Sequence, residues 1–233
     1  MTSQETKASN GSTIIIDTGC ANLSSVRYAF ERIGADVEVS DDIAKIKAAT
    51  RVVLPGVGTA KAAMQALKDK ALIDTICGLT QPVLGVCLGM QMLTKASQER
   101  GGLSYGNSYG NSYENTSQDC ECLGLIDTNI ERLDSKGLPL PHMGWNQISP
   151  SQHPLFAGVA EGSYVYFVHS YRAPLGDFTI AKSEYGEGFS AAIAKDNFMG
   201  VQFHPEKSAG VGATILKNFM RMTSDSFAKE NAL

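Results

Sequence analysis

The sequence predicts an α/β fold with a largely parallel central sheet flanked by helices. Short apolar runs at residues 13–16, 51–54 and 83–86 have the length of buried strands. Segments with apolar residues at helical spacing separate them, and strands that alternate with helices favour parallel pairing. At 233 residues, the chain has room for one substantial domain rather than two.

The remaining elements follow from the same patterns. A helix is predicted from Asn22 onward because apolar residues recur at helical spacing as far as Ile33, and Gly34 stands where a helix usually ends. The next segments predict a strand at 37–39, helices at 41–49 and 60–68, and a helix from 88 to about 96. Strands are predicted at 164–168, 189–193 and 199–203, before a closing helix at 212–222.

Three segments lack the apolar side chains of a folded core. Residues 1–12 are expected to form a disordered leader and 224–233 a polar tail, so that the predicted domain spans 13–223. Within the domain, 104–122 contains a Tyr-Gly-Asn-Ser repeat that begins at Tyr105 and again at Tyr109. We expect a low-complexity surface loop there, and we assign it no function.

Composition and charge argue against several classes of protein. A net charge of −4 gives no electrostatic reason to expect nucleic acid. The apolar runs are too short to cross a bilayer, and the N-terminal residues lack a secretory signal pattern. Five cysteines at irregular spacing argue against a disulfide framework and for reduced thiols. We therefore expect a cytoplasmic protein without a membrane or nucleic-acid partner.

One of these thiols, Cys87, lies between two glycines at the junction of a predicted strand and helix. Gly85 and Gly89 each stand two residues away, which is the pattern of a nucleophile elbow with cysteine in place of serine. Side chains at the flanking positions would collide with backbone in so tight a turn, and the start of a helix stabilises a thiolate. The alternative is a buried core cysteine, because free cysteine is among the most buried residue types.

His204 is the best placed of the four histidines to act as a base for Cys87. It follows an apolar strand, and active sites of open α/β folds gather at the ends of such strands. Pro205 favours an extended conformation at His204, so Glu206, two residues later, faces the same side and can orient the imidazole. By itself a His-Pro-Glu segment is more simply a surface turn, but together with Cys87 it predicts a Cys–His–Glu triad.

Acyl transfer at Cys87 also needs N–H donors for a developing oxyanion. The N–H of Leu88 is one candidate. A second is expected in the loop around Val57 and Gly58, where the glycines permit unusual dihedral angles. We expect the peptide before Val57 to rotate, so that the oxyanion hole is completed only in an active state. The alternative is an ordinary tight turn.

These motifs resemble those of class I, triad-type glutamine amidotransferases, with residues 85–91 similar to the nucleophile motif and 203–206 to the base motif. The segments 55–58, 141–146, 166–171 and 204–208 more narrowly resemble glutaminase subunits of imidazole glycerol phosphate synthases. The resemblance runs from residue 13 to 222 and implies a flavodoxin-like amidotransferase fold.

The resemblance also implies a reaction. Cys87 would attack the amide of glutamine, His204 would protonate the departing ammonia and then activate water, and Glu206 would orient His204. The amino-acid end of the substrate would be held by Gln91, Glu99 and the backbone of His169, Ser170 and Tyr171. No cofactor or metal is expected.

The same resemblance implies a partner. Ammonia would pass to a (β/α)8 cyclase subunit that makes imidazole glycerol phosphate and aminoimidazole carboxamide ribotide in histidine biosynthesis. Residues expected to face this partner are Asn22, Trp145, Asn146 and Lys207, although Trp145 could instead fill the core. The chain departs from the family pattern in its repeat insert and at residues 18–21, where a glycine-richer loop is usual.

Other functions remain open from the residues themselves. The predicted fold uses nearly the whole chain, so we expect the ammonia acceptor on another protein. A glutaminase for vitamin B6, anthranilate or guanylate synthesis would keep the triad. A silent regulatory subunit would not need Cys87, His204 and Glu206, and a different cysteine hydrolase would not release ammonia from glutamine.

Overall fold

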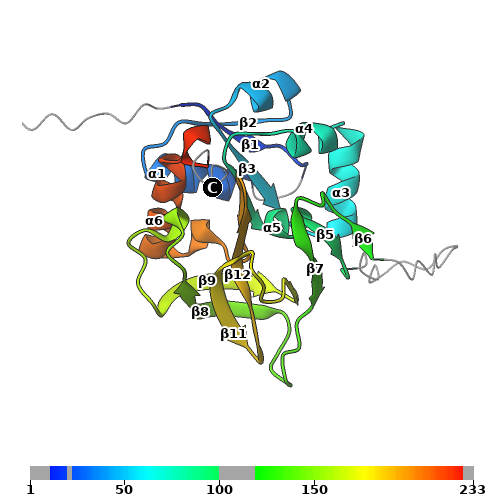
Figure 1. The fold of residues 1–233 in the computed structure, drawn as a ribbon, viewed down its shortest axis with the longest axis vertical. Coiled ribbons are helices and arrows are strands. Elements are labelled where there is room, and N and C mark those ends of the chain that lie inside the picture. Colours follow the sequence, from blue (N-terminus) through cyan, green and yellow to red (C-terminus); the bar gives the residue numbers. More distant parts are fainter. Residues whose placement is uncertain (1–10, 20–22, 100–118, 228–233) are drawn as a thin grey trace, which may run out of the picture.

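The computed structural model describes residues 11–19, 23–99 and 119–227, and its centre is one sheet of nine strands (Figure 1). Their order in the sheet is β2-β1-β3-β4-β13-β12-β11-β8-β9. In chain order they are β1 (Thr13–Ile16), β2 (Val37–Ser40), β3 (Arg51–Gly56), β4 (Val83–Cys87), β8 (His142–Pro150), β9 (Ser163–His169), β11 (Thr179–Tyr185), β12 (Glu187–Lys195) and β13 (Phe198–Val201).

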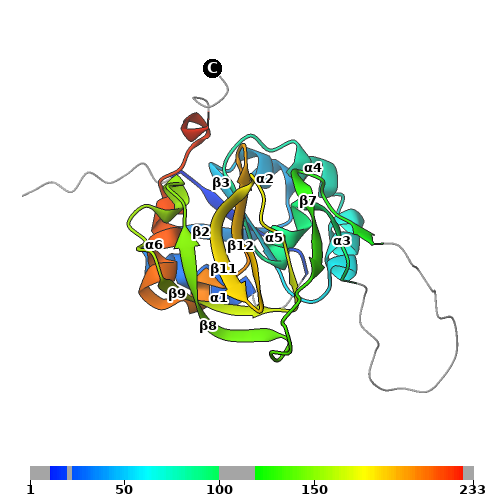
Figure 2. The ribbon, with the colours of Figure 1, turned by 60° about the horizontal axis from the view of Figure 1, so that its bottom comes forward.

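The α/β class is confirmed, with a sheet that is mixed in direction. Pairing is parallel from β2 through β1, β3 and β4 to β13, and antiparallel from β13 through β12, β11 and β8 to β9. In the parallel half, β1, β3 and β13 are buried along their whole length, as expected for strands covered on both faces. In the antiparallel half, β9 alternates buried and less buried residues. Figure 2 shows β11 and β12 across the middle of the view, with β8 below them and β9 next to α6 (Ala209–Met220).

Helices cover both faces of the parallel half. One apolar core joins alternate strand residues such as Ile15 and Val53 to α6 and α1 (Leu23–Arg32). The other core joins the intervening residues, such as Ile14 and Val52, to the remaining helices (Figure 1). These are α2 (Ile43–Ala48), α3 (Ala60–Asp69), α4 (Ile73–Cys77) and α5 (Leu88–Met92), of which α4 had not been predicted. None of the helices in the described ranges is long and apolar enough to span a membrane.

A second sheet of four strands, in the order β10-β7-β5-β6, flanks the nucleophile region. It consists of β5 (Thr94–Ser97), β6 (Cys120–Glu121), β7 (Ile126–Arg132) and β10 (Tyr171–Arg172). The predicted helix from 88 to about 96 was therefore wrong in its second half. The hydroxyl of Thr94 donates to the carbonyl oxygen of Gln91 over 2.7 Å, which competes with helical bonding, and residues 94–97 instead pair with β7.

Several predicted segments fall partly or wholly outside the described residues. Of the leader only 11 and 12 are described, and most of the insert at 104–122 lies in the undescribed range 100–118. The end of the insert is ordered, because Cys120 and Glu121 pair with β5 as strand β6. Residues 224–226 of the predicted tail form a short 3-10 turn.

Candidate active site

Cys87 stands on a strained turn between β4 and α5. Its φ of +53° and ψ of −110° lie in a region that side-chain-bearing residues rarely adopt, and such strain costs about 1–3 kcal/mol. A Cβ on Gly89 would lie 1.8 Å from the carbonyl oxygen of Leu54, and one on Gly85 would lie 2.6 Å from that of Gly89. The two glycines are therefore required by sterics, as the elbow motif predicts.

His204 reaches the same edge of the sheet because β4 and β13 are parallel neighbours. Val86 pairs with Val201, so the chain after each strand emerges at the same place. His204 Nδ1 donates to Glu206 Oε1 over 2.8 Å, and the imidazole also hydrogen-bonds Cys87. Both partners are buried: the His204 side chain is 9% exposed and that of Glu206 3%. The structure thus brings together the three predicted catalytic residues.

The charge state of His204 follows from these contacts. Burial alone would lower the pKa of His204, but the hydrogen bonds to Cys87 and Glu206 outweigh it and raise this pKa from 6.5 to about 10. A protonated imidazole can then give its proton to a leaving group, and it stabilises a thiolate beside it.

A pocket of about 320 Å³ opens directly at Cys87 and His204. All of the residues predicted for the oxyanion hole and for substrate binding line it, namely Val57, Gly58, Leu88, Gln91, Glu99, His169, Ser170 and Tyr171. Lys207, predicted for the partner face, lines it as well. The volume lies at the small end of the range for ligand pockets and suits a single amino acid.

The loop after β3 is held against the nucleophile turn. Gly56 pairs with Cys87 across the parallel strands, and a Cβ on Gly56 would lie 2.7 Å from the backbone nitrogen of Gly89. Gly58 has a φ of +93°, which favours glycine. Because Leu88 is the first residue of α5, its N–H has no partner within the helix. Donors from two elements can therefore approach the same reacting carbonyl.

Two of the predicted substrate residues have specific side-chain partners. Gln91 is buried, and its Nε2 donates to the Tyr171 carbonyl oxygen over 3.2 Å and to Gln202 Oε1 over 3.0 Å. Glu99 Oε2 accepts from the Ala60 N–H at the start of α3 over 3.1 Å. Burial raises the pKa of Glu99, and the Ala60 bond opposes that shift. The net shift is upward, and this carboxyl group lines the pocket.

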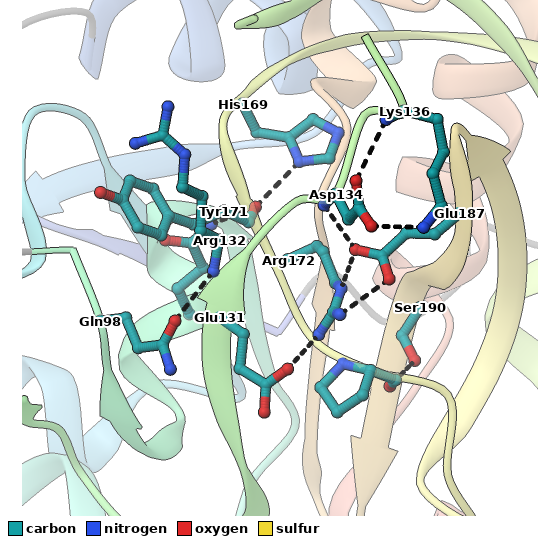
Figure 3. A network of polar contacts seen from close by, with 12 residues as sticks. Gln98, Glu131, Arg132, Asp134, Lys136, His169, Tyr171, Arg172, Glu187 and Ser190 are labelled. Atoms are coloured by element: carbon teal, nitrogen blue, oxygen red, sulfur yellow. Dashed lines mark hydrogen bonds and ion pairs between the residues drawn. The ribbon is translucent and has the colours of Figure 1, made fainter. Parts of the chain in front are cut away.

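The segment from His169 to Tyr171 contributes to the pocket through its backbone. The His169 imidazole is buried, and its Nδ1 donates to the Tyr171 carbonyl oxygen over 2.9 Å (Figure 3). The Ser170 carbonyl oxygen accepts from the Leu133 N–H over 3.0 Å, which fixes the turn between β9 and β10.

Gln202 was not predicted from the sequence. Its Nε2 lies 3.8 Å from Cys87 Sγ, and the Val168 carbonyl oxygen lies 3.8 Å from the same sulfur. The signal in the sequence was a polar amide within the apolar strand segment that precedes His204, and the structure buries it fully.

The predicted partner-facing residues lie on or near the hairpin of β8 and β9. Trp145 is 51% exposed, so the alternative that it fills the core is excluded. Its ring meets that of Tyr166 edge-on at 6.0 Å, and Lys207 Nζ lies 5.7 Å from the centre of the Tyr166 ring. Met143 and Tyr164 are also exposed on this hairpin. Asn22 lies outside the described residues.

Comparison with known proteins agrees with this geometry. The family described as "Glutamine amidotransferase class-I" matches residues 14–222. The imidazole glycerol phosphate synthase subunit HisH of Shewanella loihica is 88% identical over 220 residues, covering 94% of this chain and 95% of that protein. The chain belongs to the HisH family of class-I glutamine amidotransferases.

Further relatives support this membership. The corresponding HisH subunit of Shewanella sediminis is 69% identical to this amidotransferase over 217 residues, covering 93% of this chain and 94% of that protein. A protein from Thermoplasma acidophilum, described as a candidate GMP synthase component, has a solved structure that superposes with a TM-score of 0.67 at 16% identity. That alignment covers 95% of this chain and 98% of the other, and it shows a shared fold.

Proposed function

We propose that this chain hydrolyses glutamine to glutamate and ammonia at Cys87, as the glutaminase subunit of an imidazole glycerol phosphate synthase. The observation that carries the chemistry is the convergence of a strained cysteine and a buried His204–Glu206 pair on one amino-acid-sized pocket. The identity to HisH subunits across nearly the whole chain supports the pathway.

The geometry supports a two-step acyl transfer. The Cys87 thiolate attacks the amide carbon of glutamine, and His204, held by Glu206, gives its proton to the departing nitrogen, so that ammonia leaves and a thioester remains. The neutral His204 then takes a proton from water, and the resulting hydroxide attacks the thioester. The carbon–sulfur bond breaks, glutamate forms, and Cys87 and His204 return to their starting state.

The remaining pocket residues have binding roles in this proposal. The Leu88 N–H and the loop at Val57 and Gly58 donate to the oxyanion, where loss of one donor typically costs about 2.7–4 kcal/mol in transition-state stabilisation. The amide of Gln91 and the carboxylate of Glu99 supply oxygen acceptors for the α-ammonium group of glutamine. The backbone of residues 169–171 binds the α-carboxylate end of glutamine.

The ammonia acceptor in this proposal is a (β/α)8 cyclase subunit that forms imidazole glycerol phosphate and aminoimidazole carboxamide ribotide. The exposed hairpin with Met143, Trp145 and Tyr164 supports a protein partner, because exposed aromatic and Met side chains are enriched at interfaces. Asn146 lies on the same hairpin, Lys207 lies against the Tyr166 ring of that hairpin, and Asn22 is assigned to the same face by resemblance. We place the enzyme in the cytoplasm, in keeping with its free cysteines.

The test measures glutamate release from glutamine by wild type and by Cys87→Ala, each with and without the cyclase and its nucleotide substrate. Release that requires Cys87 and increases in the full complex is the expected result. Cys87-dependent release that is indifferent to the cyclase would assign the enzyme to another pathway. A wild type without release under any condition would contradict the glutaminase proposal.

A further inference from the structure

A chain of buried and partly buried hydrogen bonds leads from Asn146 on β8 to the substrate pocket. Asn146 Nδ2 lies 3.3 Å from His142 Nε2, and His142 Nδ1 lies 2.9 Å from His169 Nε2. His169 Nδ1 lies 2.9 Å from the Tyr171 carbonyl oxygen, which also accepts from Gln91. None of these contacts involves the catalytic triad.

The direction of every bond in this chain is fixed by its last acceptor. The Tyr171 carbonyl can only accept, so the His169 proton must be on Nδ1, and Nε2 of that ring must accept. Burial lowers the pKa of His169 to about 3 and that of His142 to about 4, so both rings are neutral and each has one N–H. His142 therefore donates through Nδ1, and its Nε2 accepts from Asn146.

The chain of hydrogen bonds also fixes the orientation of the Gln91 amide. One Nε2 hydrogen of Gln91 is used by the Tyr171 carbonyl, and the other by Gln202 Oε1. The amide oxygen is then the polar atom that Gln91 presents to the pocket, where it can accept from the ammonium group of a bound amino acid. A rotated amide would instead place its oxygen against the Tyr171 carbonyl, and two acceptors would face each other.

The Tyr171 carbonyl is held in place from its other side as well. Tyr171 pairs with Arg132 of β7, and the next residue, Arg172, contacts Glu187 through two bonds of 2.9 and 3.0 Å and Glu131 through one of 2.8 Å (Figure 3). These contacts hold β10 rigidly. The strand contacts restrain the backbone of β10, and the His169 bond sets the direction in which the Tyr171 carbonyl points.

We propose that His142 is a positioning residue: through His169 and the Tyr171 carbonyl, it orients the Gln91 amide so that its oxygen faces the substrate ammonium. This inference rests on the proposed glutaminase function. The His142 ring is well suited to the role because it is fixed by stacking, at 4.0 Å from the Tyr185 ring and 4.9 Å from the Phe167 ring between centres. It lies outside the catalytic pocket and contacts no residue of the triad.

The binding test uses the Cys87→Ala protein, which keeps the pocket but cannot turn over, and measures its affinity for glutamine by calorimetry. Adding His142→Phe keeps the ring stack and removes the Nδ1 donor, and we expect about 10-fold weaker binding. His142→Asn restores a donor near the Nδ1 position and should recover most of the affinity. Tyr185→Phe, which removes only the hydroxyl bonded to the Pro139 carbonyl, is the matched control and should bind normally.

In the active enzyme, His142→Phe should increase KM for glutamine about 10-fold. It should leave kcat within about 2-fold of wild type, because the triad is untouched. Equal affinity for glutamine in the His142→Phe and reference proteins would overturn the inference and leave the glutaminase function standing. If the Cys87→Ala protein itself bound no glutamine, that result would contradict the proposed glutaminase function, whatever the role of His142.

Nitrogen NMR of the histidine rings tests the chain without any ligand. We expect His142 and His169 both to have their proton on Nδ1, and His169 to shift when His142 is replaced by Phe. A proton on Nε2 in either ring would overturn the inference, whatever the affinity measurements show.

Discussion

His204 Nδ1 donates to Glu206 Oε1 over 2.8 Å, although the two residues are separated in the chain by proline alone. The carboxylate therefore fixes which imidazole nitrogen is left for Cys87. Burial lowers the pKa of His204, and the contacts with Cys87 and with this carboxylate together raise it above its ordinary value.

Replacing Glu206 with Gln should decrease kcat by about 100-fold, because a neutral amide supports the imidazolium less well. The KM for glutamine should change by less than about 3-fold. Steady-state glutamate release measures both constants. NMR titration of His204 should show its pKa falling below the wild-type value, and a variant with unchanged kcat would contradict the assigned role of Glu206.

The two buried neutral histidines predict a dependence of stability on pH. Because burial lowers the pKa of His142 from 6.5 to about 4, the unfolded chain binds a proton below pH 6.5 that the folded chain does not. Stability is therefore lost as the pH falls from 6.5 toward 4. Over 1.5 pH units this contribution of His142 is at most about 2 kcal/mol.

Thermal unfolding of wild type and His142→Phe between pH 7 and pH 5 isolates that contribution. Between pH 7 and pH 5, the melting temperature of wild type should fall by about 5 °C more than that of the variant, because the variant lacks the titrating ring. Carboxylates that also titrate affect both proteins alike. Parallel curves for the two proteins would show that His142 is not buried in the neutral form.

Glycine at position 89 is predicted to be indispensable. An alanine Cβ there would lie 1.8 Å from the Leu54 carbonyl oxygen, so β3 or the nucleophile turn must move. We expect Gly89→Ala to lose about 3 kcal/mol or more of unfolding free energy, measured by urea denaturation, together with all glutaminase activity.

Gly210 provides the matched control for that substitution. It lies in α6 with no heavy atom within 4 Å of an added Cβ. Gly210→Ala should therefore be neutral or more stable by about 0.5–1 kcal/mol, because alanine favours helix. A Gly89→Ala protein as stable and active as Gly210→Ala would show that the turn is less confined than these distances indicate.

The Arg172 contacts should matter for both stability and substrate affinity. Arg172 is 8% exposed and binds Glu187 and Glu131, so Arg172→Met should cost about 2 kcal/mol of unfolding free energy. Because β10 positions the Tyr171 carbonyl, KM for glutamine should also rise.

Arg27→Met is the corresponding surface control. Arg27 forms an exposed ion pair with Glu31 one helical turn away, and such pairs contribute about 0–1 kcal/mol. Its loss should leave both the urea midpoint and KM nearly unchanged. An equal effect of the two substitutions would contradict the structural role of Arg172.

The nucleophile turn and the His204–Glu206 pair could be predicted from local patterns in the sequence. The glycines around Cys87 and the proline between His204 and Glu206 impose backbone geometry over a few residues, so those features could be identified without knowledge of the fold. The residues around the pocket, by contrast, were assigned through family resemblance. The structure places them together, since Gln91 of α5 contacts Tyr171 of β10, 80 residues later in the chain.

Features that depend on pairing between strands far apart in the sequence could not be predicted from local patterns. Residues 94–97 read as a continuing helix until their strand partner in β7 is known. The switch to antiparallel pairing beyond β13 likewise depends on where β8, β11 and β12 return to the sheet. The chain from Asn146 to Gln91 joins four separate elements, and no spacing in the sequence predicts it.

The parallel pairing of β4 with β13 has a consequence for how the enzyme can change. Nucleophile and base lie more than a hundred residues apart, and the register of the two strands, in which Val86 pairs with Val201, aligns them. Removing a single residue from β13 would exchange which side chains enter the two cores, since successive strand residues face opposite sides. Such a deletion would disrupt the packing of both cores together with the alignment of the catalytic groups, so changes in length should be tolerated better in the connecting loops than in this strand.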